Sequence, residues 1–269
     1  MKKIFGMMLF ASALLLTGCQ KDNVEANNDL QKKGVVNPFA SVGVAHNNFL
    51  MDLGYEFEDL LNSDKPLDSV EAEALIDGFL NYTKGELSEY AMPMGLNVDD
   101  FVDESFVAFC DFFDEYDDDS MLESLLEESK DMSNLLANVR DLEADIILNM
   151  QTHQDSASLM SLTIFEYSLM FWDDAYTNAQ NPWHSVMQSL QSQFDSKGSL
   201  SLLKKIRKWW NANKNRIVGS VLTGGYFDYK AAEAIIEVFP EVLSQPWILG
   251  AIIGLGSAAG VVVAWLGID

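Results

Sequence analysis

The sequence predicts an all-α fold, a multi-helix bundle with an apolar, glycine-rich helix near its C-terminus. Apolar residues recur at helical spacing in the first such segment, where Phe49, Leu53 and Phe57 form one stripe with Asp52 and Glu56 between them. Strand-like alternation is nearly absent, and proline or glycine separates several of the helical segments. No repeat of about 30–50 residues is visible, which argues against a solenoid.

Seven helices are predicted ahead of the C-terminal one. They span residues 41–62, 67–83, 98–115, 120–136, 139–151, 156–178 and 183–195. Because proline and glycine end helices, breaks are expected at Lys65-Pro66, Pro93, Asn181-Pro182 and Lys197-Gly198. Ser120 to Glu123 fits a capping box, which explains the acids before Met121 without a ligand.

The chain divides into four predicted segments. Residues 1–18 read as a lipoprotein signal peptide, and residues 19–36 are too polar to form a core and suit a flexible tether. Residues 37–196 form an acidic helical domain, and residues 197–269 combine a basic amphipathic helix with an apolar C-terminal helical segment.

The N-terminus has the order of elements of a lipoprotein export signal. Lys2-Lys3 forms a basic region, Ile4–Leu16 an apolar run of 13 residues, and Thr17-Gly18 supplies small residues before Cys19. The apolar run is too short to span a bilayer. The segment resembles the signals of bacterial lipoproteins, so we expect Cys19 to carry lipid, palmitate included, and to anchor the mature protein to a membrane.

An ordinary signal peptide is the alternative, but it needs a small residue three positions before the cut, where Leu16 is large. The segment Cys19-Gln20-Lys21-Asp22-Asn23 resembles the signal that sends some gram-negative lipoproteins to the cell surface. Asn23 departs from the second acid expected in that signal. The expected location is therefore the outer membrane of the cell envelope, with the body exposed at the surface.

Charge is strongly acidic and unevenly placed. Without residues 1–18 the chain carries 15 basic and 41 acidic side chains, a net charge of −26. Residues 51–150 contain 28 acids and four bases, whereas residues 196–230 contain eight bases against Asp228 alone. Such a chain repels nucleic acid, so no nucleic-acid partner is expected. The basic stretch is expected to dock on the acidic half, although each exposed ion pair contributes only about 0–1 kcal/mol.

Sequence motifs that carry known chemistry are missing. The chain has no H-E-x-x-H, C-x-x-C, phosphate loop or G-x-S-x-G, and the S-x-x-K at Ser201–Lys204 lacks its partner motifs. The acids between 111 and 119 lack the calcium-loop pattern. We therefore expect no enzyme activity, no cofactor and no metal.

Two single residues are candidates for reactive groups. Cys110 lies in an apolar run and is expected to be a buried, inert thiol rather than a nucleophile. Glu166 stands alone among apolar residues, so burial without a partner would favour its neutral form; a place at the helix edge is the commoner arrangement.

The tail from Trp247 to Ile268 is the strongest membrane signal. It has 22 residues without a charge, and as a helix it would be about 33 Å long against a hydrocarbon layer of about 30 Å. Trp247 and Trp265 stand 18 residues apart, near the spacing of an aromatic belt. Two G-x-x-x-G pairs permit close helix contact, namely Gly250, Gly254, Gly256 and Gly260. Burial as a core helix, membrane insertion and an oligomer contact all suit this pattern.

A basic amphipathic helix is predicted upstream, from Leu200 to Trp210. It suits either a lipid interface or docking on the acidic half of the chain. The segment Ile217–Thr223 is a candidate partner for the apolar tail in a helical hairpin.

The opening of the body resembles a family of uncharacterised envelope lipoproteins of gram-negative bacteria. The resemblance rests on Asn37-Pro38-Phe39, on the G-x-x-H-N run Gly43-Val44-Ala45-His46-Asn47 and on the glycine-rich apolar C-terminus. It implies no catalytic role, because that family has no assigned reaction. From the residues alone, we expect His46 and Asn47 to hydrogen-bond neighbouring backbone rather than a ligand.

Two functional hypotheses follow from these observations. The first is a surface-tethered lipoprotein that acts as a non-enzymatic interaction or binding module with an unknown protein partner. The alternative is a membrane-active, toxin-like or self-assembling effector that inserts residues 247–268.

Overall fold

The structure is a computed structural model that describes residues 36–62, 67, 69–91, 95, 97–115, 120–195, 218–239 and 245–266. These residues contain ten helices and no strand, which confirms the all-α prediction. The helices are α3 (Ala40–Glu56), α4 (Glu58–Leu61), α5 (Ser69–Ala91), α6 (Val98–Glu115), α7 (Ser120–Glu128), α8 (Met132–Asn149), α9 (His153–Thr177), α10 (His184–Asp195), α12 (Gly219–Val238) and α13 (Pro246–Leu266).

The predicted helices recur with shifted ends. The predicted helix 98–115 matches α6 at both ends, whereas α5 runs on to Ala91 and the first helix is interrupted at Phe57. The break predicted between residues 136 and 139 is wrong, because α7 ends at Glu128 and α8 begins at Met132. Asp131 caps α8 by accepting a hydrogen bond from the backbone nitrogen of Asn134 at 2.8 Å, which fixes the start there.

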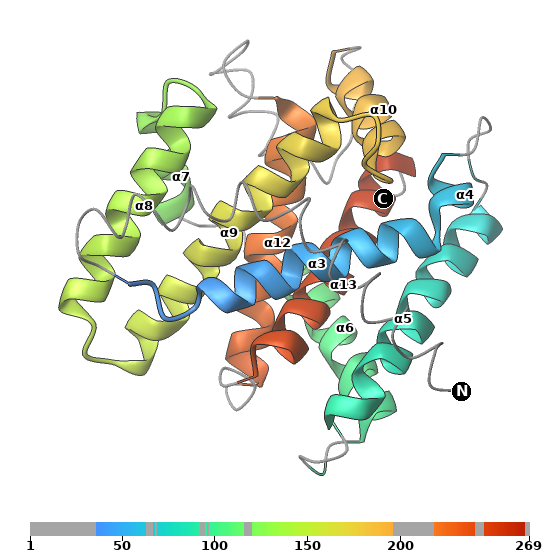
Figure 1. Cartoon of the computed structure of the whole chain (residues 1–269), viewed down its shortest axis with the longest axis horizontal. Coiled ribbons are helices and arrows are strands. Elements are labelled where there is room, and N and C mark those ends of the chain that lie inside the picture. Colours follow the sequence, from blue (N-terminus) through green and yellow to red (C-terminus); the bar gives the residue numbers. More distant parts are fainter. Residues whose placement is uncertain are drawn as a thin grey trace, which may run out of the picture.

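The apolar C-terminal helix α13 lies inside the bundle. It packs against α3, α12, α5, α10 and α6, and Figure 1 shows it passing behind α3. Of its most apolar 18-residue window, 89% is buried in the body. Burial as a core helix, the first of the three arrangements that suit this tail, is therefore the one that the structure has.

The glycines of α13 lie against two main neighbouring helices, α3 and α12. A methyl group added at Gly250 would lie 2.6 Å from the backbone nitrogen of His46, and one at Gly254 would lie 2.8 Å from the Phe49 ring, both on α3. One at Gly260 would lie 2.5 Å from the Phe227 ring on α12, and Gly256 faces both α12 and α6. Each G-x-x-x-G pair thus allows one close approach between helices.

The pair α12 and α13 shares one hydrophobic core with the helices of residues 40–195. The helix α12 packs against α9, α13, α6 and α10, and nearly all of its residues are buried. Of the candidate partner segment, residues 219–223 lie in α12, which contacts α13, and Ile217 is outside the described residues.

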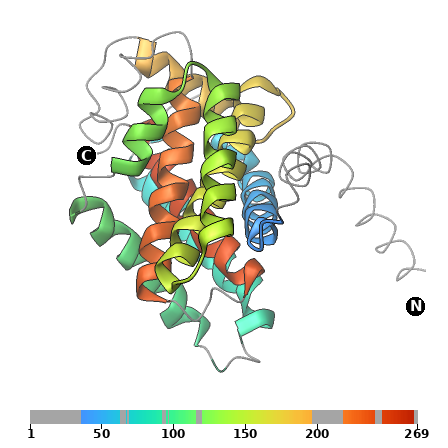
Figure 2. The same cartoon turned by 90° about the vertical axis from the view of Figure 1, so that its left-hand side faces the viewer.

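The helices α7 and α8 form a hairpin, residues 120–149, at one end of the molecule. Figure 1 places them at the opposite end from α4 and α5, and Figure 2 views the molecule from their side. The main contacts of α8 are with α9 and α7, so the α7–α8 hairpin is attached to the body chiefly through α9.

Some predictions fall on residues outside those described. These are the signal peptide, Cys19, the tether up to residue 35, the acids 116–119, the basic helix from 200 to 210 and Ile268. The prediction for Cys110 is wrong, because this residue is exposed on α6. The buried residues Phe101, Ser105 and Phe109 define the inner side of α6, and position 110 lies one residue off that stripe.

Candidate functional site

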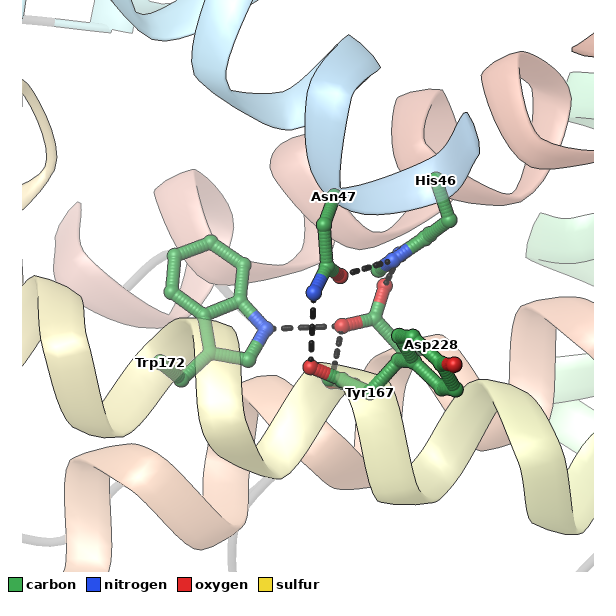
Figure 3. Close-up of polar contacts among 6 residues, drawn as sticks. His46, Asn47, Tyr167, Trp172 and Asp228 are labelled. Atoms are coloured by element: carbon green, nitrogen blue, oxygen red, sulfur yellow. Dashed lines mark hydrogen bonds and ion pairs between the residues drawn. The ribbon is translucent and has the colours of Figure 1, made fainter. Parts of the chain in front are cut away.

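The candidate site is a buried polar network that joins α3, α9 and α12. It consists of His46 and Asn47 on α3, the Tyr167 carbonyl, Ser168 and Trp172 on α9, and Asp228 on α12 (Figure 3). We call this set the Asp228 network. His46, Ser168, Trp172 and Asp228 are each 0% exposed, so their polar atoms must be satisfied within the protein.

The Asp228 carboxylate is the centre of the network. Its Oδ1 lies 2.6 Å from His46 Nε2, its Oδ2 accepts a hydrogen bond from Trp172 Nε1 at 2.7 Å, and the Ser168 hydroxyl also donates to Oδ2. Hydrogen bonds to a charged acceptor are about twice as strong as neutral ones. Three convergent donors therefore stabilise a carboxylate that water does not reach.

Asn47 helps to position the His46 ring. The Asn47 amide nitrogen donates to the Tyr167 carbonyl at 3.0 Å, so its oxygen faces His46 Nδ1 at 2.9 Å. His46 Nε2 lies 2.6 Å from Asp228 Oδ1, so each ring nitrogen has an oxygen atom as its hydrogen-bond partner. The imidazole and the carboxylate are both fully buried and therefore depend on each other for hydrogen bonding.

Two glycines make these contacts sterically feasible. A methyl group added at Gly43 would lie 2.4 Å from the Tyr167 ring, and one at Gly224 would lie 2.4 Å from the Trp172 indole. The rings therefore occupy the space that larger residues would fill, and α3 and α12 both approach α9 closely. In the G-x-x-H-N run, Gly43, His46 and Asn47 each make a contact that fixes α3 in the fold.

The geometry of the Asp228 network differs from that of a serine nucleophile. The Ser168 hydroxyl donates its hydrogen bond to Asp228 and not to His46. The hydroxyl of an activated serine hydrogen-bonds the imidazole that takes its proton. In the part of the chain described, no group of three or more His, Cys, Asp or Glu side chains is placed to hold a metal ion.

No family model, curated protein or solved structure matches this chain. The roles of the G-x-x-H-N run and of the apolar C-terminus therefore follow from the contacts that these residues make within the molecule.

A second buried polar cluster joins α8, α9 and the segment before α3. Arg140 Nε donates to Glu166 Oε1 at 2.5 Å, and Glu166 is only 1% exposed. Glu166 is therefore buried with a partner, contrary to the expected place at a helix edge. Asn37 donates to the Thr163 hydroxyl at 2.8 Å beside this pair.

Glu143 completes this cluster and has an unusual environment. Its carboxyl is fully buried, and burial, followed by the charge of Glu166, raises the pKa of Glu143 well above its ordinary value. The same two influences, burial first, raise the pKa of Tyr167.

The sequence-predicted site residues of the described structure lie in two places, on the helix α13 and in the Asp228 network. Trp247 and Trp265 lie half-buried at the two ends of α13, and the four glycines between them contact other helices. His46 and Asn47 lie in the Asp228 network, where Asn47 bonds backbone as predicted and His46 pairs with a carboxylate instead.

Sequence reasoning missed Ser168, Trp172 and Asp228. For Asp228 a signal existed, because it is the only charged residue between Arg216 and Lys230, in an otherwise uncharged run of helical character. An acid in such a run requires a buried partner. The partner is 182 residues away in the sequence, and no local pattern identifies it.

Proposed function

We propose that this chain is a surface-tethered lipoprotein whose helical body acts by contacting another molecule, without catalysis. The observation that carries the proposal is the state of the Asp228 network. Its imidazole, hydroxyl and carboxylate are the side chains best suited to chemistry, and all are buried and engaged with one another. The exposed surface is therefore the part of the described structure that is available to contact another molecule.

The acidic surface of α5 and α6 supplies the chemistry of contact. Eight exposed acids lie on these two helices, namely Glu71, Glu73, Asp77, Glu86, Asp99, Asp100, Asp103 and Glu104. Lys84 pairs with Asp103 at 2.7 Å and neutralises one of them. A surface of this charge attracts a cationic partner and repels anionic ones, with an attraction that salt screens.

A defined probe tests this contact surface. We expect an oligolysine peptide to bind the purified body at low salt and to be released as ionic strength rises. Neutralising Glu71, Glu73, Asp77 and Glu86 on α5 to Gln or Asn should weaken binding more than neutralising four exposed acids of the α7–α8 hairpin, Glu127, Glu128, Asp141 and Asp145. Equal losses would mean that net charge, rather than the α5 surface, decides binding.

The tether is tested separately in the native host. Labelled palmitate should enter the wild-type protein and not a Cys19→Ala variant, and the labelled protein should fractionate with the outer membrane. Proteinase K added to intact cells should digest the body. If digestion occurs only after detergent opens the cells, the surface location is wrong.

A second candidate function is membrane insertion of α13. One observation favours it: α13 has 21 residues, and its most apolar 18-residue window has a mean hydropathy of 2.1, so the helix is long and apolar enough to cross a bilayer. Core helices of soluble proteins share this composition, and 89% of its most apolar window is buried in the body.

Liposome leakage distinguishes insertion from permanent burial. Val263 is half-buried in α13, so Val263→Asp is tolerated in the body but places a charge in the inserted segment. Under the insertion hypothesis this variant loses leakage activity, while the control Val238→Asp, at an exposed position on α12, keeps it. Absence of leakage by the unmodified protein at any pH or lipid composition would rule out this candidate.

A further inference from the structure

The α7–α8 hairpin depends on one helix interface. Its apolar residues, including Leu122, Leu126, Leu135 and Val139, join the core, but the main contact of α8 with the body is with α9. Glu143 lies in the middle of α8 and is fully buried, so it places an acid within this attachment.

The carboxyl of Glu143 is incompletely satisfied. Thr163 and Asn37 lie close enough to lower the pKa of Glu143, and the charge of Glu166 raises it, yet neither Glu143 oxygen makes a hydrogen bond of normal geometry among the described residues. The Thr163 hydroxyl donates instead to the Leu159 carbonyl at 2.8 Å. Buried polar atoms without a partner are rare and costly, so this position requires a further donor.

The charges of Glu143, Glu166 and Arg140 do not balance when both carboxyls are ionised. Glu143 and Glu166 carry two negative charges when both are ionised, and Arg140 supplies one positive charge through its 2.5 Å contact with Glu166. Among the contacts of the described residues, Glu143 has neither a donor nor an opposite charge of its own, and a single proton supplies both. Two buried carboxylates that share a site hold a proton for this reason.

We propose that Glu143 and Glu166 bind one shared proton, and that this proton holds the α7–α8 hairpin against α9. The proton is carried on a Glu143 oxygen and donated to a neighbouring oxygen, while Arg140 remains on Glu166. Its loss leaves two carboxylates facing one guanidinium out of reach of water. Separation of α8 from α9 then relieves the repulsion by letting water reach Glu143.

The surroundings of Glu143 support a proton as the bound species. Among the described residues, the titratable groups that interact with Glu143 are Glu166 and Tyr167 on α9, and Arg140 lies one turn away on its own helix, while Asn37 and Thr163 are uncharged. Arg140 already neutralises Glu166 and repels a further metal cation. The raised pKa of Glu143 has the same direction, because burial and the charge of Glu166 both favour the protonated carboxyl.

Hydrogen exchange of the α8 amides tests the proposal on the whole mature chain. After correction for the intrinsic pH dependence of exchange, the opening equilibrium of α8 in the wild type should rise with pH, by up to about tenfold per pH unit, because opening releases one proton. Glu143→Gln keeps the shape but cannot ionise, so its opening should be independent of pH. Asp145→Asn, which removes an exposed acid from the same helix, should retain the wild-type dependence.

A second measurement does not depend on a variant that folds. Infrared spectra of protein labelled with carbon-13 at glutamate carboxyls should show a protonated carboxyl band at neutral pH in the folded wild type and lose it on unfolding. Absence of this band, α8 opening that does not change with pH, or pH-dependent opening that persists in Glu143→Gln would each overturn the proposal.

Discussion

Replacing Asp228 by asparagine should destabilise the protein strongly. The change keeps the shape of the side chain but replaces one of the two acceptor oxygens by an amide donor, which faces groups that already donate. It also alters the partner of the buried His46 ring, 2.6 Å away. Altering one partner of a buried charged contact costs about 3–5 kcal/mol. That is a large part of the roughly 5–15 kcal/mol that stabilises a typical domain.

Urea denaturation followed by circular dichroism measures this loss. With a slope of roughly 3 kcal/mol/M for a chain of this size, the midpoint should fall by about 1–2 M. The control Asp77→Asn removes an exposed acid from α5 and should change the free energy of unfolding by less than about 0.5 kcal/mol.

A double-mutant cycle assigns the loss to the contact between His46 and Asp228. If His46 and Asp228 stabilise each other, His46→Gln combined with Asp228→Asn should cost less than the sum of the two single changes, by about 0.5–3 kcal/mol. Additive losses, or a loss below about 1 kcal/mol for Asp228→Asn, would refute the view that this pair joins α3 to α12.

Three further predictions concern single residues. Gly250→Ala should lower the free energy of unfolding by about 1–2 kcal/mol in urea melts, because its methyl group meets the backbone of His46 at 2.6 Å; Gly85→Ala, with nothing within 4 Å, should raise it by about 0.5–1 kcal/mol. The folded state holds a proton on Glu143, whereas the unfolded state releases it above about pH 4.5. The free energy of unfolding of the wild type should therefore fall relative to that of Glu143→Gln as pH rises from that value. Paired urea melts should show a fall of at most about 1.4 kcal/mol per pH unit. Cys110 should react with a maleimide in the folded protein at a rate close to that in urea, since it is exposed; protection in the native state would contradict its placement.

The sequence was sufficient to predict the helices but not the contacts among them. Helical spacing and proline breaks identified α6 at both ends, because its apolar stripe and its limits are local properties. The start of α8 was missed because the Asp131 cap is weaker than a proline signal, although the cap is visible in the sequence. The helix α5 continues beyond its predicted end to Ala91, and Leu87 in this extension is buried in the core.

The candidate site was less predictable for a physical reason. His46 and Asn47 were identified from their motif, but Asp228 lies 182 residues from His46, and only the fold brings the two together. Likewise, Glu166 was identified as a lone acid in an apolar run, while its partner Arg140 lies on another helix. A single sequence shows that a buried charge needs a partner without showing which residue supplies it.

The glycine pattern of α13 explains why composition alone left core burial and membrane insertion open. Small residues at a four-residue spacing allow helices to approach closely in either setting. In this protein Gly254 receives the ring of Phe49 from α3, and Gly260 receives that of Phe227 from α12. Insertion of α13 alone would give up both contacts, and insertion together with α12 would also separate Asp228 from His46 in a medium without water. The Asp228 network therefore opposes release of the apolar helices, and any trigger for insertion has to break it first.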